Sequence, residues 1–379
     1  MTTDVSIIKC RGYEAGLIRR AVEESIEKIG GVESFVRKGE RLLLKPNMLA
    51  AKEVSAGVTT HPEVVRAVAQ IVIDAGGVPV IGDSPAMGSA LKVGKKCGIL
   101  KVAEELSVEF VPLVTPVHVE AQEGAVFKRL EIAKEALQVD GIINLPKLKT
   151  HAQMFLTMGV KNIFGCVPGK RKVQWHFSAG IDSTHFAGMI LDLYLYLQPR
   201  LTVMDAVISM EGNGPMSGEP RQTNFIAASP EAIALDRVMI EVLGRKVEEV
   251  PIIQNAAWRG IEAASMDNIK IHGDGMENFR IDNFKVPPTM HTNFAASLPE
   301  FLEKRLRKSI TSRPHIRQSQ CTKCGLCIKV CPLNIISRRE GGIYIDHKDC
   351  IRCFCCQEMC PWHAIDIKEG WLKRIVPGL

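Results

Sequence analysis

The sequence of 379 residues lacks the features of a secreted or membrane protein. Its first ten residues contain neither a basic segment nor an apolar one, so they do not resemble a signal peptide. The most apolar stretch, residues 67–81, is interrupted by Gln70, Asp74 and a pair of glycines, which argues against a membrane-spanning helix. These absences predict a cytoplasmic protein with no membrane partner.

The excess of positive over negative charge is small, and common nucleotide-binding motifs are absent. Lys and Arg total 48 against 42 Asp and Glu, a surplus too small for a dedicated nucleic-acid binder unless it is concentrated in one place. The chain contains neither the GxGxxG fingerprint of dinucleotide-binding folds nor the GxxxxGK phosphate loop. A tightly bound nicotinamide or ATP is therefore not indicated.

Cysteine is scarce over most of the chain and dense near its end. Only Cys10, Cys97 and Cys166 precede residue 321, whereas nine cysteines lie between Cys321 and Cys360. In a chain without secretory features, this density favours metal binding over disulfides.

Eight of these nine cysteines form a repeat. The run Cys-x2-Cys-x2-Cys-x3-Cys-Pro begins at Cys321 and again at Cys350. In two-cluster ferredoxins with this spacing, the fourth cysteine of each run binds the other cluster. The repeat therefore predicts two [4Fe–4S] clusters, one on Cys321, Cys324, Cys327 and Cys360, the other on Cys350, Cys353, Cys356 and Cys331. Zinc is the less favoured alternative, because four-cysteine zinc sites usually pair two CxxC motifs.

The ninth cysteine, Cys355, has no place in this scheme and is either a free thiol or a group with a redox or ligand-substituting role. The segment from 321 to 370 resembles a bacterial-type two-cluster ferredoxin domain, a small α+β unit. The resemblance implies electron transfer, and the alternative is a pair of clusters that only stabilise the fold.

The first part of the chain, to about residue 275, alternates β-branched runs with helical patterns, which predicts an α/β domain with a partly parallel sheet and flanking helices. His61-Pro62-Glu63 begins one predicted helix, which ends at Gly76-Gly77, and a second covers residues 230–243. The predicted strands are Val5–Cys10, Arg41–Pro46, Val78–Gly82, Glu109–Val114, Gly141–Leu145, Leu201–Ala206, Phe225–Ala228 and Ile269–His272.

The predicted boundaries give an α/β domain at 1–286, a helix and basic linker at 287–320, the ferredoxin domain at 321–370 and an apolar tail at 371–379. Residues 303–320 hold six basic residues and one acidic residue. This arm lacks interleaved aromatic residues, so an acidic redox partner protein is favoured over nucleic acid.

Polar and charged residues follow several predicted strands or begin helices. Ligands of open α/β sheets collect at the carboxyl ends of strands. The candidate ligand-binding residues are therefore Lys45, Asn47, His61, Asp83, Lys147, Lys149, Thr150 and Asn162. The lysines suit a carboxylate or phosphate ligand, and solvated loop lysines are the alternative. For His61 and Asp83 the alternative, a helix cap, is the favoured interpretation.

Three further residues are candidate catalytic groups: Lys161, His151 and Glu211. Glu211 lies in the Gly- and Pro-rich segment 211–215 and is either an acid or base or part of a turn without chemistry. We predict that Lys149, His151 and Lys161 line one pocket, on the side from which the clusters can be reached.

The strings KPN, TTHPE, PKLKTH, GVKNIFG and EGNGP resemble the family called domain of unknown function 362, from about Val5 to Val286. The resemblance leaves the reaction open. Residues 151–169 are also similar to a stretch of the nickel-pincer lactate racemase family, in which a lysine carries the cofactor, and this similarity singles out Lys161.

The favoured hypothesis is an iron–sulfur oxidoreductase of low-oxygen metabolism that acts on a small anionic substrate or cofactor, with any second cofactor unidentified. One alternative is an isomerase or lyase distantly like lactate racemase, with clusters in a storage or structural role. Another is a non-catalytic redox adaptor.

Overall fold

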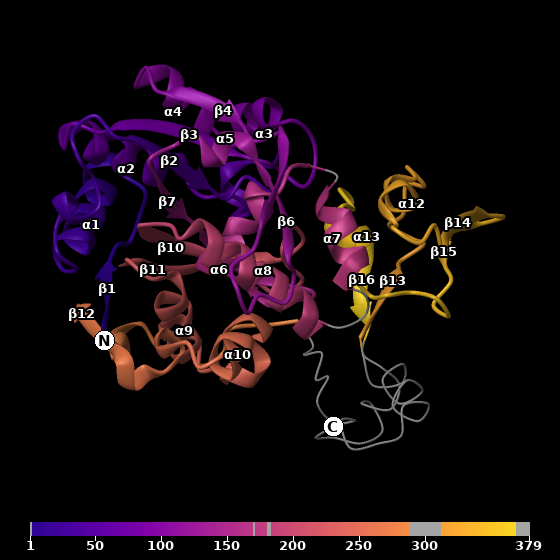
Figure 1. Ribbon diagram of the computed structural model, residues 1–379. Coiled ribbons are helices and arrows are strands. Elements are labelled where there is room, and N and C mark those ends of the chain that lie inside the picture. The colour runs from indigo at the N-terminus through magenta and orange to yellow at the C-terminus, as the bar shows by residue number, and fades with distance from the viewer. Residues whose placement is uncertain (1, 170, 180–182, 288–311, 369–379) are drawn as a thin grey trace.

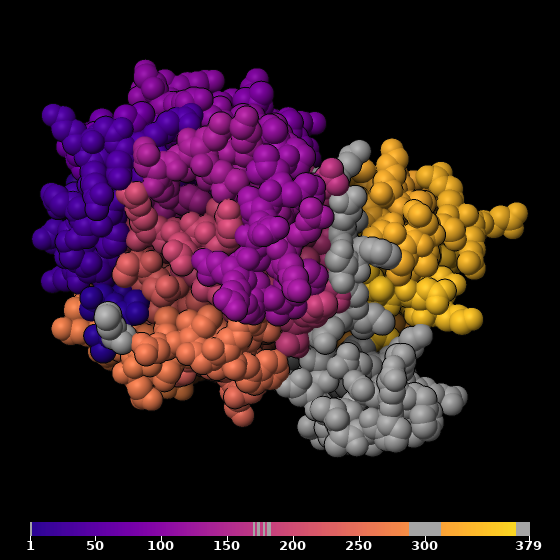
Figure 2. Space-filling model, in the orientation of Figure 1, coloured from indigo at the N-terminus to yellow at the C-terminus, as the bar shows by residue number. Residues whose placement is uncertain are grey.

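The computed structural model describes residues 2–169, 171–179, 183–287 and 312–368, which form a large α/β domain and a smaller C-terminal module beside it (Figures 1 and 2). The short helix expected within the 287–320 segment, at residues 298–308, and the tail expected at 371–379 lie outside the described residues. Among the described residues, no helix is both long and apolar enough to cross a membrane.

A ten-stranded mixed sheet forms the centre of the large domain. Five strands are mutually parallel: β4 (Glu109–Pro112), β3 (Val78–Asp83), β2 (Arg41–Pro46), β7 (Gly141–Leu145) and β10 (Leu201–Glu211). The sheet continues through antiparallel β11 (Glu219–Ser229) to β1 (Thr3–Lys9) and β12 (Ile269–Gly273). The predicted α/β fold with a partly parallel sheet is thus confirmed.

Alternating side chains divide the core into two layers, one on each face of the sheet. Leu42 and Leu44 pack in one layer and Leu43 in the other. The first layer is covered by α1 (Ala15–Glu27), α2 (Pro62–Asp74), α3 (Ala90–Lys96) and α4 (Ile99–Glu105). The second contains α5 (Lys134–Leu137), α6 (Gly159–Asn162), α7 (Arg171–Ala179), α8 (Ser183–Leu197), α9 (Ala232–Val242) and α10 (Pro251–Trp258).

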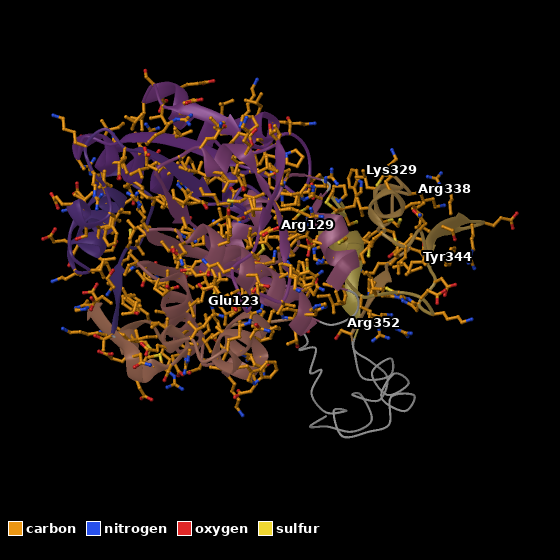
Figure 3. The ribbon with its side chains drawn as sticks, viewed as in Figure 1. Glu123, Arg129, Lys329, Arg338, Tyr344 and Arg352 are labelled. Carbon is orange, nitrogen blue, oxygen red and sulfur yellow. The ribbon has the colours of Figure 1, made fainter. Side chains whose placement is uncertain are left out.

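Two hairpins differ from the sequence expectation. The segment expected to be a loop after β7 forms β8 (Lys147–His151), which pairs with β10 and with β9 (Phe155–Thr157). Its alternating lysines hide the strand pattern, because they are buried by polar partners rather than by apolar ones. A separate hairpin of β5 (Pro116–Glu120) and β6 (Arg129–Ala133) carries Glu123 and Arg129, which are labelled in Figure 3.

The C-terminal module contains two two-stranded sheets and two short helices. Its elements are β13 (Arg313–Ile316), α12 (Leu326–Val330), β14 (Ile336–Arg339), β15 (Gly342–Ile345), α13 (Cys355–Glu358) and β16 (Ile365–Lys368). Strand β13 pairs with β16, so residues 313–316 belong to this module and not to a linker. The expected boundary at 321 is therefore too late, because a four-residue strand containing proline gives little periodic signal.

Candidate functional site at the junction of the two domains

The carboxyl ends of parallel strands place charged side chains at one edge of the sheet. Strand β2 carries Lys45 near its end, Asn47 follows it, and β3 ends with Asp83. The β8–β9 hairpin then carries Lys149 and His151 to the same region. This arrangement agrees with the general position of ligand sites in open α/β sheets.

A cavity of about 610 Å³ lies at this edge, a volume suited to a metabolite-sized ligand. Both domains form its wall. The charged or titratable wall residues are Lys45, Asp83, Lys149, His151, Lys161, Lys172, His176, Lys329, Cys355 and Glu358. Five lysines against two carboxylates favour an anionic ligand.

Apart from exposed Lys329, Lys161 is the cavity lysine that is most available to a ligand. Its Nζ lies 4.6 Å from the centre of the Phe164 ring and 6.0 Å from that of Phe186, and among the described residues it has no hydrogen bond or ion pair. Burial lowers the pKa of Lys161 to about 8, opposed by the negative charge of Glu358. An incoming anion would replace the water that this ammonium loses.

Lys45 is held in place by the protein itself. Its Nζ lies 2.8 Å from Asp83 Oδ1 and donates hydrogen bonds to Pro46 O and to Asn162 Oδ1. Gly165 packs directly against this pair, since a Cβ at that position would collide with both side chains. The buried pair therefore shapes the floor of the cavity and contributes little net charge.

The other two deeply placed lysines also have polar partners. Lys149 donates to Asn47 Oδ1 at 2.8 Å and to Val58 O at 2.6 Å, and burial lowers its pKa well below the usual value. Lys172 donates to the carbonyl oxygens of Ser84 and Val167, and burial lowers its pKa to about 7. Both pKa values rise if an anion binds beside them.

His151 and Glu358 join the two domains inside the cavity. His151 Nε2 lies 3.1 Å from Glu358 Oε1, and His151 Nδ1 accepts hydrogen bonds from the backbone N–H groups of Gln153 and Met154. Because Nδ1 is an acceptor, the proton of the neutral ring is on Nε2, facing the carboxylate. Burial lowers the pKa of His151, and His151 lowers that of Glu358 to about 2.

His176 and Cys355 complete this part of the wall. His176 is buried, its Nδ1 has no hydrogen-bond partner among the described residues, and burial lowers its pKa to about 3. Cys355 is buried beside Cys353, and its hydrogen bond to that residue, followed by burial, raises its pKa well above the usual value. At neutral pH, therefore, a neutral imidazole and a thiol face the ligand.

The loop expected to carry an acid or base instead holds the C-terminal module. Gln357 Nε2 donates to Asn213 Oδ1 at 2.9 Å and to Gly214 O at 3.3 Å. Thr150 Oγ1 accepts from Gly214 N and so supports this loop. Glu211 lies outside the cavity wall, in an ion pair of 2.7 Å with Arg221.

Two other predicted site residues lie elsewhere on the same edge. Lys147 Nζ lies 2.8 Å from Asp205 Oδ2 and donates to Tyr13 Oη. His61 stacks on Tyr13 with ring centres 3.6 Å apart, and its Nδ1 accepts from Glu63 N at the start of α2. These contacts assign His61 to capping and Lys147 to a buried ion pair.

Sequence reasoning left several wall residues out of the predicted site. Lys172 and His176 belong to α7, which follows the family-like stretch, and Glu358 lies between the last two cysteines of the second run. No local pattern marks Glu358 as a cavity residue. The sequence did single out Cys355, because it lies outside the repeat, but it did not predict that this thiol lines the cavity.

The eight repeat cysteines are grouped as the crossed assignment requires. Cys321, Cys324, Cys327 and Cys360 surround one small cavity, and Cys331, Cys350, Cys353 and Cys356 surround another. Among the described residues, no three His, Cys, Asp or Glu side chains converge as closely as a single metal ion needs. The thiolate donor sets fit iron–sulfur centres, which spread their ligands over a larger volume.

Comparison with known proteins agrees with this geometry. Residues 42–241 match the family described as Domain of unknown function (DUF362), and residues 313–362 match the family described as 4Fe-4S dicluster domain. The chain belongs to the DUF362 family. It also carries an iron–sulfur domain, as its cysteine runs predict.

A curated relative of this DUF362 protein is the Thylakoid-associated protein sll1697 of Synechocystis, 39% identical over 76% of this chain and 89% of the relative. Among solved structures, the lactate racemase apoprotein from Thermoanaerobacterium thermosaccharolyticum has a TM-score of 0.40 at 13% identity, covering 61% of this chain and 55% of that one. A structural-genomics protein from Thermotoga maritima has a TM-score of 0.39 at 13% identity, covering 59% and 57%. The chain thus spans little more than half of each solved chain.

Proposed function

We propose that this protein exchanges electrons between its iron–sulfur domain and a small anionic molecule bound in the cavity between the two domains. The observation that carries the proposal is the shared wall: Cys355, Glu358 and Met359 of the second cysteine run line the same cavity as Lys161 and His151. A ligand held there would lie against the loop that binds one cluster.

The second quartet borders this wall on two sides. Cys355 lies in sequence between the ligands Cys353 and Cys356, and Val330, another wall residue, directly precedes Cys331. Iron–sulfur centres supply one-electron transfer at low potential when they are bound. The short path from the quartet to the wall supports a redox role over a purely structural one.

The chain's own residues would hold the ligand and keep it dry. Lys161 offers an ammonium group to a carboxylate or phosphate, and Phe164 excludes water behind it. The unpartnered Nδ1 of His176 offers one further polar contact. His151 holds Glu358 in position across the domain junction, so the ligand-facing carboxylate stays ionised near the Lys161 ammonium.

The proposal includes one [4Fe–4S] cluster on each quartet and a cytoplasmic protein that works at low oxygen. Its test begins with anaerobic purification and native mass spectrometry of any small molecule that is retained. The identified molecule is then mixed with the reduced protein while the visible cluster absorbance is followed. We expect reoxidation of the clusters in the wild type and in the surface control Lys28→Ala, but not in Lys161→Ala. Ligand binding without any redox change would contradict the proposal.

A further inference from the structure

The two cysteine quartets differ in their access to solvent. Cys324 of the first quartet is exposed, although Cys327 and Cys360 are buried, whereas the second quartet has no exposed member. Trp362 lines the small cavity of the first quartet and is 55% exposed. Among the described residues, no cysteine of either quartet lines the cavity itself, but Val330 and Cys355, which adjoin Cys331 and Cys356 of the second quartet in sequence, do. The first quartet therefore includes the solvent-exposed cysteine, and the second has sequence neighbours in the cavity wall.

The surface around the first quartet is positively charged. Residues 321–340 contain four basic residues and one acidic residue, Glu340, all of them exposed; the basic ones are Lys323, Lys329, Arg338 and Arg339. Arg338 donates a hydrogen bond to the carbonyl oxygen of Lys323, which places this arginine over the first cysteine loop. Figure 3 shows Lys329 and Arg338 on the same side of the module, away from Arg352.

The second run has no comparable surface. Residues 346–358 alternate Asp346, Lys348, Asp349, Arg352 and Glu358, so the two signs of charge are mixed. A generally basic module would show the same excess around both runs. Positive charge is concentrated beside exposed Cys324 and not beside the buried cysteines of the second run. This difference favours a binding surface at Cys324 over lysines that are merely solvated.

We propose that the cationic face, formed by Lys323, Cys324, Arg338, Arg339 and Trp362, docks a small acidic redox protein. The inference deepens the proposed function and rests on it, because it supplies the partner for the electrons exchanged at the ligand cavity. Complementary charge steers such a partner, and exposed Trp362 offers an aromatic contact at the centre of the encounter.

The electron balance of the docking step is simple. Each productive encounter moves one electron between the partner and the iron–sulfur centre of the first quartet, so one protein is oxidised and the other reduced. No bond or proton is exchanged at this surface. The basic surroundings lower the cost of bringing a negatively charged protein to this edge, because the cluster with its four thiolates is itself anionic.

The experiment compares two matched double variants of the full-length, cluster-loaded chain. Lys323→Glu/Arg339→Glu reverses two charges on the cationic face, and Lys28→Glu/Lys38→Glu reverses two exposed charges on the large domain. The probe is a reduced acidic two-iron ferredoxin, and oxidised cytochrome c, a basic protein of similar size, accepts electrons from the reduced clusters in a parallel measurement. Stopped flow gives the rate of cluster reduction or oxidation, and calorimetry gives binding without turnover.

We expect the ferredoxin rate at low salt to fall at least about tenfold in the cationic-face variant and less than about twofold in the control, with the difference disappearing at high salt. Calorimetric affinity for ferredoxin should fall in parallel, while iron content and visible spectrum stay unchanged. Equal ferredoxin rates in both variants, or a loss of rate with cytochrome c as large as that with ferredoxin, would overturn the proposal. So would a rate that depends on Arg305, Arg307 and Lys308 instead of on the cationic face.

The test separates this inference from the proposed function. Ferredoxin exchange is measured without the cavity ligand, and ligand-dependent reoxidation is measured without ferredoxin. If ferredoxin binding follows the cationic face but no ligand ever reoxidises the clusters, the docking surface stands and the ligand chemistry fails. The reverse result removes the docking surface alone.

Discussion

The two cysteine runs have the same spacing but different surroundings. The first run has an exposed cysteine, Cys324, beside basic residues, and the second buries its first three cysteines within the C-terminal module. Of the two runs, only the second carries an extra cysteine and the cavity carboxylate Glu358. Identical ligand spacing therefore does not imply identical roles, because the roles depend on what each loop faces.

The large domain determines this asymmetry. Gln357 donates to Asn213 and Gly214, and His363 contacts Lys52 and Ser217, so the second half of the module is held at the sheet edge. Hydrogen bonds to charged groups contribute roughly 1.5–3 kcal/mol each and neutral ones about 1 kcal/mol. A few such contacts suffice to fix one orientation of a module of this size.

The largest expected effect comes from the crossed cysteine ligands. We expect the anaerobically prepared wild type to contain about eight irons and eight sulfides, one cubane for each quartet. Cys331→Ala should disturb the centre built mainly on the second run and leave that of the first run intact, because the fourth ligand crosses over. Iron analysis and electron paramagnetic resonance measure this, with Cys10→Ala, which removes a large-domain cysteine outside both quartets, as the control.

Damage confined to the first-run centre in Cys331→Ala would show that the ligand sets are not crossed. Zinc without iron in the wild type would remove the iron–sulfur assignment of both quartets.

The sequence predicts the features that lie within one motif or element, but not the contacts between distant segments. The repeat predicts both ligand sets, apolar runs predict β2 and β7, and helical periodicity with its Pro and Gly boundaries predicts α2, all with bounds within a residue or two of those observed. The position of Glu358 could not be predicted, because it depends on packing between segments about 200 residues apart, His151 and α13. Strand β8 was missed for a related reason: its buried lysines are satisfied by distant groups such as Asp205 and Asn47.

The next largest effect is on ligand affinity, and among the two iron–sulfur centres only that of the second quartet should respond to the ligand. Lys161→Ala removes the unpaired ammonium from the cavity, so affinity for the identified anion should fall roughly tenfold to a hundredfold, the range expected for a charge-assisted hydrogen bond. Calorimetry measures the affinity. Ligand-induced changes in the resonance spectrum should occur at the second centre in the wild type and disappear in the variant. Changes at the first centre only would reverse the roles of the two runs.

A smaller effect is a shift in pH dependence. Burial lowers the pKa of Lys161 to about 8, and an anion binds its charged form, so wild-type affinity should fall as pH rises above about 8. Lys172, with a pKa of about 7, adds a weaker decline that begins earlier. Glu358 raises the pKa of Lys161, so in Glu358→Gln the decline should begin at lower pH. Calorimetric titration across pH measures both profiles, and superimposable profiles would show that Glu358 does not act on Lys161.

The smallest expected effect tests the cysteine that distinguishes the second run. Cys355 lies outside both quartets, so Cys355→Ser should retain the full iron content and the first-centre spectrum. Because Cys355 is hydrogen-bonded to the ligand cysteine Cys353 and also lines the cavity, we expect a modest change in the second-centre spectrum and in ligand affinity, within about fivefold. Loss of about four irons would instead make Cys355 a cluster ligand. A spectrum and an affinity both identical to the wild type would show that the extra thiol has no part in coupling the second centre to the cavity.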